Sequence, residues 1–168
     1  NSSQPYFIAE IGVNYENDIN RAKKIIKLAK EGGADAVKFQ SYKAETIACK
    51  TSPYYWDLKE VPIKSQFLLF KKFDKFGFKE FKILKNYCDK IKIDFLSTPF
   101  DLDAVDYLDH LVPFFKVASA DINNFPLIKK ICSKNKPIVI STGATTFNEI
   151  QKTVSFIKKL NNNIKIII

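Results

Sequence analysis

The sequence predicts a parallel α/β fold, because short apolar runs alternate with amphipathic helical segments along the whole chain. Its 168 residues, 46% of them hydrophobic, are enough for one sizeable core. About five and a half strand–helix units suggest most of a (β/α)8 TIM barrel, whose usual size is about 250 residues. Either roughly a third of that barrel lies outside these residues, or the sheet is an open, doubly wound one. The apolar end Ile164–Ile168, which reads as a sixth strand, favours the barrel.

The first part of the chain predicts two strands and the helix between them. Phe7–Val13 is an apolar run of strand length that contains a carboxylate, Glu10, which is costly to bury without a compensating charge. The helix begins after the N-cap Asp18, has apolar residues at 3.6-residue spacing and ends at Gly32-Gly33. The second strand is Ala36–Gln40.

The middle of the chain predicts a long connection, two helices and a strand. The connection Ser41–Lys64 exceeds the length of about 12 to 15 residues beyond which loops tend to be functional. Helices are expected at Gln66–Phe73 and at Phe78–Ile91, the second with one apolar face. The third strand, Asp94–Thr98, is closed by Pro99.

The same unit is repeated with shorter elements in the next part of the chain. A helix at Leu102–His110, with Leu102 expected to face inward, precedes a strand at Phe114–Ser119. A helix at Phe125–Ser133 then precedes the short apolar strand Pro137–Ser141.

A capping box predicts where the last helix begins. The hydroxyl of Thr146 and the carboxylate of Glu149, three residues later, can each bond the backbone at the other position. Ile150, Val154 and Ile157 follow at helical spacing, so this helix has one apolar face to pack against the sheet.

The composition argues against several classes of protein. The formal net charge of +9 comes almost wholly from lysines spread along helix faces, so nucleic acid is not an expected partner. No run approaches the roughly 18 apolar residues of a membrane span and no secretory signal opens the chain, so a cytoplasmic protein without a membrane partner is expected. Cys49, Cys88 and Cys132 lack metal-binding spacing and are expected to be buried free thiols.

Polar side chains gather at the predicted strand ends, where parallel α/β folds carry their chemistry. Three charged residues lie within otherwise apolar strands, namely Glu10, Lys38 and Lys116. Hydroxyl and amide side chains accompany them: Gln40, Thr98, Ser119 and Ser141. Two lysines with several hydroxyls suit a phosphate or carboxylate ligand, and a carboxylate beside them would serve as acid or base. No glycine-rich phosphate loop follows any strand, which argues against a nucleotide site.

Five segments at these strand ends fit one family in order and spacing. They read IAEIGVN at 8–14, ADAVKFQ at 34–40, LSTPF at 96–100, FKVAS at 115–119 followed by NNFPLI at 123–128, and ISTG at 140–143. From Tyr6 to its end the chain resembles the N-acetylneuraminate (sialic acid) synthase family. One such segment is a weak signal, whereas five in register are a specific one.

The resemblance implies a TIM barrel that is followed, in full-length members, by a small antifreeze-protein-like domain. Residues 1–168 would then be part of the barrel domain. It implies a transferase that joins phosphoenolpyruvate to an N-acylated hexose, typically N-acetylmannosamine, with formation of a C–C bond and release of phosphate. It also implies a divalent metal, Mn or Mg, whose ligands lie beyond residue 168, and a homodimer at full length.

The resemblance also implies roles for the matched positions. Glu10 would be the catalytic acid/base carboxylate beside the sugar aldehyde. The positions on the phosphoenolpyruvate side would be Lys38, Thr98 and Ser119 at its carboxylate and Lys116 and Ser141 at its phosphate. Gln40 and the connection Ser41–Lys64 would lie on the sugar side.

The chain departs from the family pattern at two places near its start. Tyr15 stands where the family usually has histidine, and Asn17-Asp18 stand where a glycine normally follows. These departures bear on the identity of the sugar more than on the reaction. The acceptor of sialic, legionaminic, pseudaminic or spore-coat precursor synthesis therefore remains open.

Two other functions are compatible with the sequence. One is a Schiff-base aldolase of the same barrel fold, with Lys38 or Lys116 as the nucleophile. The other is a non-catalytic barrel remnant that acts as a binding module.

Overall fold

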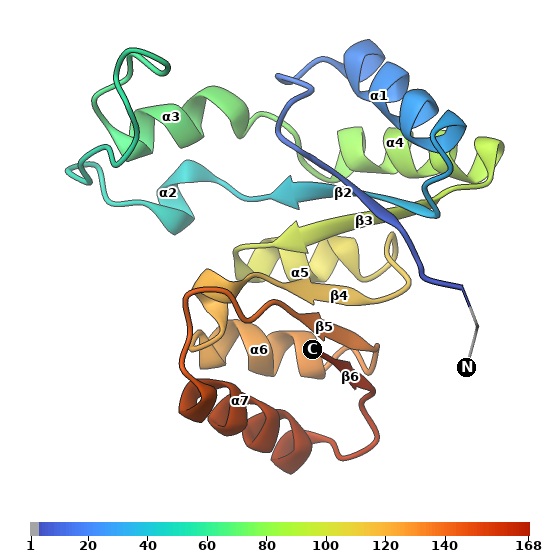
Figure 1. Ribbon diagram of the computed structural model, residues 1–168, viewed down its shortest axis with the longest axis vertical. Helices are drawn as coiled ribbons and strands as arrows, with labels where there is room; N and C mark the ends of the chain where they lie inside the picture. Colours follow the sequence, from blue (N-terminus) through green and yellow to red (C-terminus); the bar gives the residue numbers. More distant parts are fainter. Residues whose placement is uncertain (1–3) are drawn as a thin grey trace.

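The computed structural model describes residues 4–168, in which six parallel strands alternate with helices (Figure 1). The strands are β1 Ile8–Gly12, β2 Ala36–Ser41, β3 Asp94–Pro99, β4 Phe115–Val117, β5 Ile138–Ile140 and β6 Ile166–Ile167. The helices are α1 Ile19–Glu31, α2 Ala44–Ile47, α3 Gln66–Phe73, α4 Phe78–Ile91, α5 Leu102–Leu108, α6 Phe125–Cys132 and α7 Phe147–Leu160. A 3₁₀ turn, η1 Ser119–Asp121, follows β4. The predicted parallel α/β class is confirmed.

The strands follow one another in space in the order in which they occur in the chain. One parallel ladder joins β1, β2 and β3, and a second joins β4, β5 and β6. Strands β3 and β4 lie next to each other between the two ladders (Figure 1). The register pairs Glu10 with Lys38 and Gln40 with Thr98, so the polar positions of neighbouring strands stand side by side.

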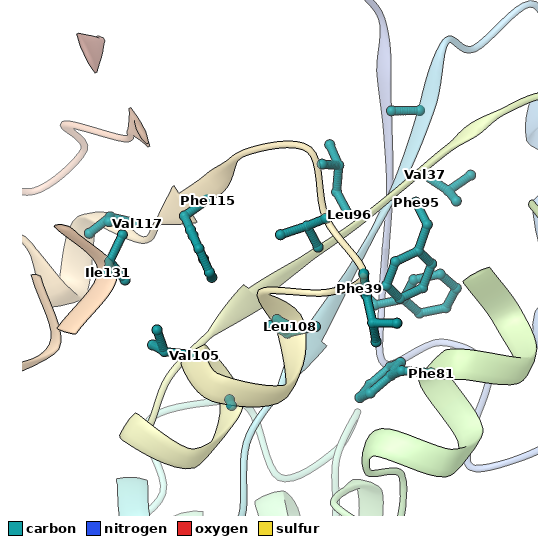
Figure 2. Close-up of a cluster of buried hydrophobic side chains, with 14 of the residues drawn as sticks. Val37, Phe39, Phe81, Phe95, Leu96, Val105, Leu108, Phe115, Val117 and Ile131 are labelled. Carbon is teal, nitrogen blue, oxygen red and sulfur yellow. The ribbon is translucent and has the colours of Figure 1, made fainter. Parts of the chain in front are cut away.

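One face of the sheet is covered by helices, and we call it the outer face. Phe39 of β2 and Phe95 of β3 stack at 5.5 Å between ring centroids, and both rings contact Phe81 of α4 (Figure 2). Phe115 and Val117 of β4 are also buried. These side chains belong to one hydrophobic core, which extends to the buried positions of α5, α6 and α7.

The opposite face of the sheet, which we call the inner face, is less covered. Lys38 and Gln40 alternate with the fully buried Val37 and Phe39 along β2, and both are half-buried. Closer to the amino ends of the strands the inner face is apolar. There Ile8 of β1, Val139 of β5 and Ile167 of β6 line a single cavity of about 400 Å³. The first and last strands therefore lie across one hollow from each other.

Local capping signals define most helix boundaries. The carboxylate of Asp18 accepts hydrogen bonds from the first amides of α1, and Thr146 and Glu149 form the predicted capping box of α7. Helices α3 and α4 have the boundaries that the apolar spacing predicts.

Three predictions about individual residues are wrong. Strand β4 ends at Val117, so Ser119 lies in η1 rather than in the strand. The turn forms because the amide of Asp121 donates a hydrogen bond to the carbonyl of Ala118. Leu102 is 48% exposed, since it occupies the first turn of α5 at the edge of the core. Cys49 is a free thiol but exposed, whereas Cys88 and Cys132 are buried free thiols.

The long connection after β2 is tied to the body of the fold by two aspartates. Asp74 is 4% exposed and accepts a hydrogen bond from the amide of Ala44 at 3.0 Å. Asp101, the N-cap of α5, accepts from the amide of Lys43 and the hydroxyl of Thr46. The connection therefore has a fixed start beside the carboxyl end of the sheet. No helix in the part of the chain that the structure describes is long and apolar enough to cross a membrane.

Candidate active site

Three side chains from neighbouring strands meet on the inner face. Lys38 forms an ion pair with Glu10, and its ammonium also donates a hydrogen bond to the Thr98 hydroxyl at 3.3 Å. The other carboxylate oxygen of Glu10 accepts from the amide of Gly12 at 3.1 Å. Because Lys38 is 12% exposed and Thr98 only 2%, this lysine presents a positive charge that is partly shielded from water.

Glu10 is not the buried carboxylate that its apolar neighbours predict. Its side chain is 53% exposed, because the inner face above β1 is open to solvent in these residues. The predicted compensation by a lysine is nevertheless present, since Glu10 and Lys38 are directly paired. Glu10 can therefore meet a small molecule and remain in contact with a cation.

Lys116 belongs to the same electrostatic environment. Burial, and to a smaller extent the charge of Lys38, lower the pKa of its ammonium to about 8, while the charge of Glu10 acts in the opposite direction. The ammonium is held by a hydrogen bond to the carbonyl of Val117 at 2.6 Å. Lys38 of β2 and Lys116 of β4, strands that are separated by β3, repel each other, so an anion bound near both would be stabilised.

The two predicted serines lie on the segments that follow β4 and β5. Ser119 is the first residue of η1 and Ser141 directly follows β5, where its amide bonds the carbonyl of Val117. Gly143 lies beside Ser119, since a Cβ built on this glycine would lie 3.7 Å from the Ser119 hydroxyl, in ordinary van der Waals contact. Both serines are half-buried. They therefore stand at the same end of the sheet as Lys116.

Gln40 joins this group of charges to a hollow on the carboxyl side of the sheet. A Cβ built on Gly12 would lie 3.6 Å from the Gln40 side-chain nitrogen and 3.9 Å from a Glu10 oxygen, so the amide and the carboxylate flank the same point. On its other side Gln40 lines a cavity of about 560 Å³ together with Phe70 of α3 and Asp121 of η1. The structure thus places two lysines, Lys38 and Lys116, on one side of Gln40 and a cavity large enough for a small molecule on the other side.

Comparison with known sequences identifies the family. The sequence profile described as the NeuB family matches residues 25–168, which is most of the chain. The chain belongs to the NeuB family. This agrees with the family that the five strand-end segments resemble.

Individual NeuB-family relatives carry related names. The chain is 42% identical to the N,N'-diacetyllegionaminic acid synthase of Campylobacter jejuni, an alignment that covers 90% of the chain and 46% of that protein. It is 37% identical to the N-acetylneuraminate-9-phosphate synthase of Mus musculus, covering 94% and 44%. The chain spans about half the length of the curated relatives it matches.

A solved structure of a NeuB-family protein has the same arrangement of the chain. The N-acetylneuraminic acid synthetase of Leptospira borgpetersenii, crystallised with citrate, superposes with a TM-score of 0.82 at 33% identity. The alignment covers 97% of this chain and 53% of that one. The fold described above is therefore the fold of about half of such a synthase.

The structure adds one acidic residue that sequence reasoning missed in this NeuB-family chain. Asp121 faces the cavity beside Gln40, and burial raises the pKa of its carboxyl group while a hydrogen bond from Asn124 opposes that rise. The available signal was its position two residues after Ser119, between the matched segments 115–119 and 123–128. Asp121 is a second carboxyl group beside the candidate site.

Tyr15 lies away from the site in this structure. Its ring is 1% exposed and packs 4.5 Å from Phe76 and 5.5 Å from Phe39, measured between ring centroids, in the outer-face core. Asn17 fixes the loop that carries it, because its side-chain amide bonds the carbonyl of Lys72 and the amide of Lys75. Tyr15 therefore packs in the outer-face core and does not line the cavity beside Gln40.

The described residues do not by themselves form a metal centre. Within residues 4–168 no three His, Cys, Asp or Glu side chains come close enough together to hold a metal ion. Glu10 forms an ion pair with Lys38, and Asp121 accepts a hydrogen bond from the Asn124 side chain.

Proposed function

We propose that this chain supplies the substrate-binding half of a nonulosonic acid synthase, which condenses phosphoenolpyruvate with an acetamido hexose and releases phosphate. The observation that carries the proposal is the contact of Glu10, Lys38 and Thr98 on the inner face, with Lys116 in the same electrostatic field. Membership of the NeuB family and the names of its relatives support it. The citrate in the Leptospira structure shows that a relative can hold a small carboxylate.

We further propose that residues 1–168 are part of a (β/α)8 barrel domain. The strands follow their chain order without the reversal that marks a doubly wound sheet. Ile8 of β1 and Ile167 of β6 face one hollow, as expected when a sheet curves toward closure. The family resemblance further implies a small second domain and a homodimer for the full-length protein.

The proposed reaction assigns a step to each group. Lys38, Thr98 and Ser119 would bind the carboxylate of phosphoenolpyruvate, and Lys116 and Ser141 its phosphate. The C3 carbon of the enol would form a bond to the sugar aldehyde carbon, and the aldehyde oxygen would take a proton from Glu10. Water would then add to C2 and return one proton to Glu10, and cleavage of the bond between C2 and the phosphate oxygen would leave a ketone at C2 as inorganic phosphate departs with the second proton. Glu10 suits the proton transfer because it is accessible and is flanked by Gln40.

The divalent metal that the family resemblance implies would need ligands from outside residues 1–168, because no suitable cluster lies within the described part. In the proposed reaction, the residues of this chain bind and orient the substrates, and the metal is held by residues outside it.

The proposal is tested by phosphate release from the full-length protein. With phosphoenolpyruvate and an acetamido hexose, Glu10→Ala should abolish turnover while phosphoenolpyruvate still binds in calorimetry. Glu16→Ala is the matched control, since Glu16 lies six residues away, is similarly exposed and pairs with Arg21 rather than with Lys38. Lys116→Ala should chiefly raise the phosphoenolpyruvate KM. Retained turnover in Glu10→Ala would contradict the proposal.

A Schiff-base aldolase is the second candidate, and one observation favours it. A lysine whose pKa is lowered to about 8 is partly neutral near neutral pH, and a neutral amine is the form that attacks a carbonyl. Borohydride in the presence of pyruvate would trap such an enzyme at Lys116, and Lys116→Ala would prevent the trapping. The synthase should not be trapped. If neither trapping nor phosphate release is found in the full-length protein, the binding-module alternative gains support.

A further inference from the structure

Two segments at the carboxyl end of the sheet contain the two serines of the candidate site. We call residues 118–124, which include η1, the Ser119 segment, and residues 141–146, which join β5 to α7, the Ser141 segment. Where the two segments begin, the amide of Ser141 donates to the carbonyl of Val117 at 3.1 Å. Beyond that bond both segments leave the strands, so the sheet alone does not fix the distance between the two serine hydroxyls.

Helix α7, which packs beside α6, contacts the Ser119 segment through one of its faces (Figure 1). Glu149, Thr153 and Phe156 follow one another at spacings of four and three residues, so they lie on the same side of the helix. Their partners lie within four consecutive positions after η1, namely Asn123, Ile122 and Phe125 respectively. One stripe of α7 therefore follows the end of the Ser119 segment.

The contact that Thr153 makes is fully buried. Its hydroxyl donates to the carbonyl of Ile122 at 2.7 Å, and the residue has no exposed surface. A threonine inside a helix often bonds a carbonyl of its own helix, one turn earlier. This one bonds a carbonyl 31 residues away in the chain, directly after η1. Because a buried acceptor is costly to leave without a donor, the bond fixes the end of η1 against α7.

The carboxylate of Glu149 bonds both segments at once. One of its oxygens accepts from the amide and the hydroxyl of Thr146 at 2.7 and 2.8 Å, which completes the capping box of α7. Its other oxygen accepts from the side-chain amide of Asn123 at 2.7 Å. The bonds from Thr146, followed by the bond from Asn123, hold the pKa of this carboxyl group below its usual range. Glu149 therefore links the last residue of the Ser141 segment to the Ser119 segment.

The Ser141 segment has a conformation that its sequence does not favour. Ala144 has a φ of +53°, in the left-handed region where a Cβ is costly. Such a conformation persists where surrounding contacts hold it, and it is frequent at binding sites. The contacts here are the bond from the Thr145 hydroxyl to the carbonyl of Thr142 at 3.2 Å and the capping box that follows. The capping box therefore stabilises this segment as well as the start of α7.

We propose that Glu149 and Thr153 are positioning residues of the phosphoenolpyruvate site, because together they hold the Ser119 segment against the Ser141 segment. They act through these two segments, whose serine hydroxyls must keep the spacing between the carboxylate and the phosphate of one bound molecule. This inference rests on the proposed function, in which Ser119 and Ser141 bind the two ends of phosphoenolpyruvate.

The test uses the full-length protein and measures the phosphoenolpyruvate Kd by calorimetry and its KM by phosphate release. Thr153→Val removes the buried bond, and Asn123→Ala removes the bond to Glu149 while the capping box stays intact. Thr153→Val should raise both constants by about tenfold, and Asn123→Ala by about threefold because its bond is exposed. The acceptor KM and kcat should change by less than about twofold. Thr153→Ser keeps the hydroxyl and should restore most of the phosphoenolpyruvate affinity.

Two controls on α7 separate positioning from a loss of stability. Ile157→Val trims a fully buried side chain of the same helix and leaves every hydrogen bond in place. Asn161→Ala removes a bond of 2.8 Å to the Asn135 side chain, which joins the far end of α7 to the segment after α6. Both controls should leave the phosphoenolpyruvate Kd and KM unchanged. A purely structural role of Thr153 would reduce the fraction of folded enzyme, and so the observed kcat, without changing KM.

The outcomes distinguish the inference from the proposed function. An unchanged phosphoenolpyruvate Kd and KM in Thr153→Val and Asn123→Ala would overturn the inference and leave the proposed function intact. Increases of the same size in Ile157→Val and Asn161→Ala would overturn it as well. If Thr153→Val does not fold, Asn123→Ala decides alone, since Asn123 is exposed. A wild-type protein that does not bind phosphoenolpyruvate would instead contradict the proposed function.

Discussion

The two faces of β2 differ in what they contact, although their residues alternate within six positions of one strand. On the outer face, Val37 and Phe39 are fully buried under helices. On the inner face, Lys38 and Gln40 are half-buried and contact other polar side chains or a cavity. The outer face carries the packing energy and the inner face carries the chemistry. Substitutions on the two faces should therefore separate stability from function.

The largest effect is expected from truncation on the outer face. Phe39→Ala removes a ring that contacts Tyr15, Phe81 and Phe95, and it should lower the free energy of unfolding by about 3–5 kcal/mol. Gln40→Ala, the adjacent position on the inner face, should cost less than about 1 kcal/mol. Urea denaturation followed by circular dichroism measures both. Similar losses at the two positions would refute the division between the faces.

A smaller effect is expected where an outer helix supports the turn beside the site. The hydroxyl of Thr153 in α7 is fully buried and donates to the carbonyl of Ile122, directly after η1, at 2.7 Å. Thr153→Val leaves that carbonyl without a donor and should cost about 1–3 kcal/mol. Thr153→Ser keeps the hydroxyl and should recover most of the loss in the same denaturation experiment. A serine variant as unstable as the valine variant would show that the hydrogen bond is not the cause.

Gly12 tests the backbone rather than a side chain of the inner face. Its φ of +58° suits glycine, so Gly12→Ala should cost about 1–2 kcal/mol in backbone strain. The added Cβ itself would find room, since it would lie 3.6 Å from the Gln40 nitrogen. Gly143→Ala is the control, because this glycine has no positive φ and a Cβ there makes only ordinary contact. Equal losses in thermal unfolding would mean that strain at Gly12 is not responsible.

The smallest effect is a dependence on pH that arises from Lys116. Its pKa of about 8 in the folded chain lies below the ordinary value of 10.5, so between these values the unfolded chain binds more protons. Stability should therefore rise with pH across this window, by less than about 1 kcal/mol once solvent screening of a half-buried group is considered. Lys116→Met should remove this part of the slope, measured by urea denaturation at pH 8 and pH 10. An unchanged difference between the two pH values would contradict the lowered pKa.

The boundaries of several elements were predictable from local sequence. Asp18 caps α1 and the Thr146–Glu149 box caps α7, because these side chains bond amides only a few residues away. Helices α3 and α4 have the bounds that their apolar spacing predicts, because that spacing is also a pattern over a few neighbouring residues. Ser119 did not follow this pattern, since the turn that carries it is held in part by Thr153, 31 residues from the carbonyl it bonds.

The candidate site was predictable in its members but not in its environment. The charges embedded in apolar strands indicated that Glu10 and Lys38 belong to one site, and the structure pairs them. Their exposure depends on what covers the inner face, which no local pattern reveals. Asp121 and Tyr15 illustrate the same limit, because an acidic residue was brought to the cavity and a tyrosine was withdrawn into the core by contacts between distant elements.

The sequence by itself determined the order of strands and helices, which charged and polar residues make up the candidate site, and the family to which the chain belongs. These properties follow from periodicity, capping and short motifs, which act over a few residues. Only the tertiary structure decided that Glu10 is accessible, that Lys116 has a lowered pKa and that Thr153 bonds the carbonyl of Ile122. Burial and charge are sums over neighbours that are distant in the chain, and folding is what brings those neighbours together.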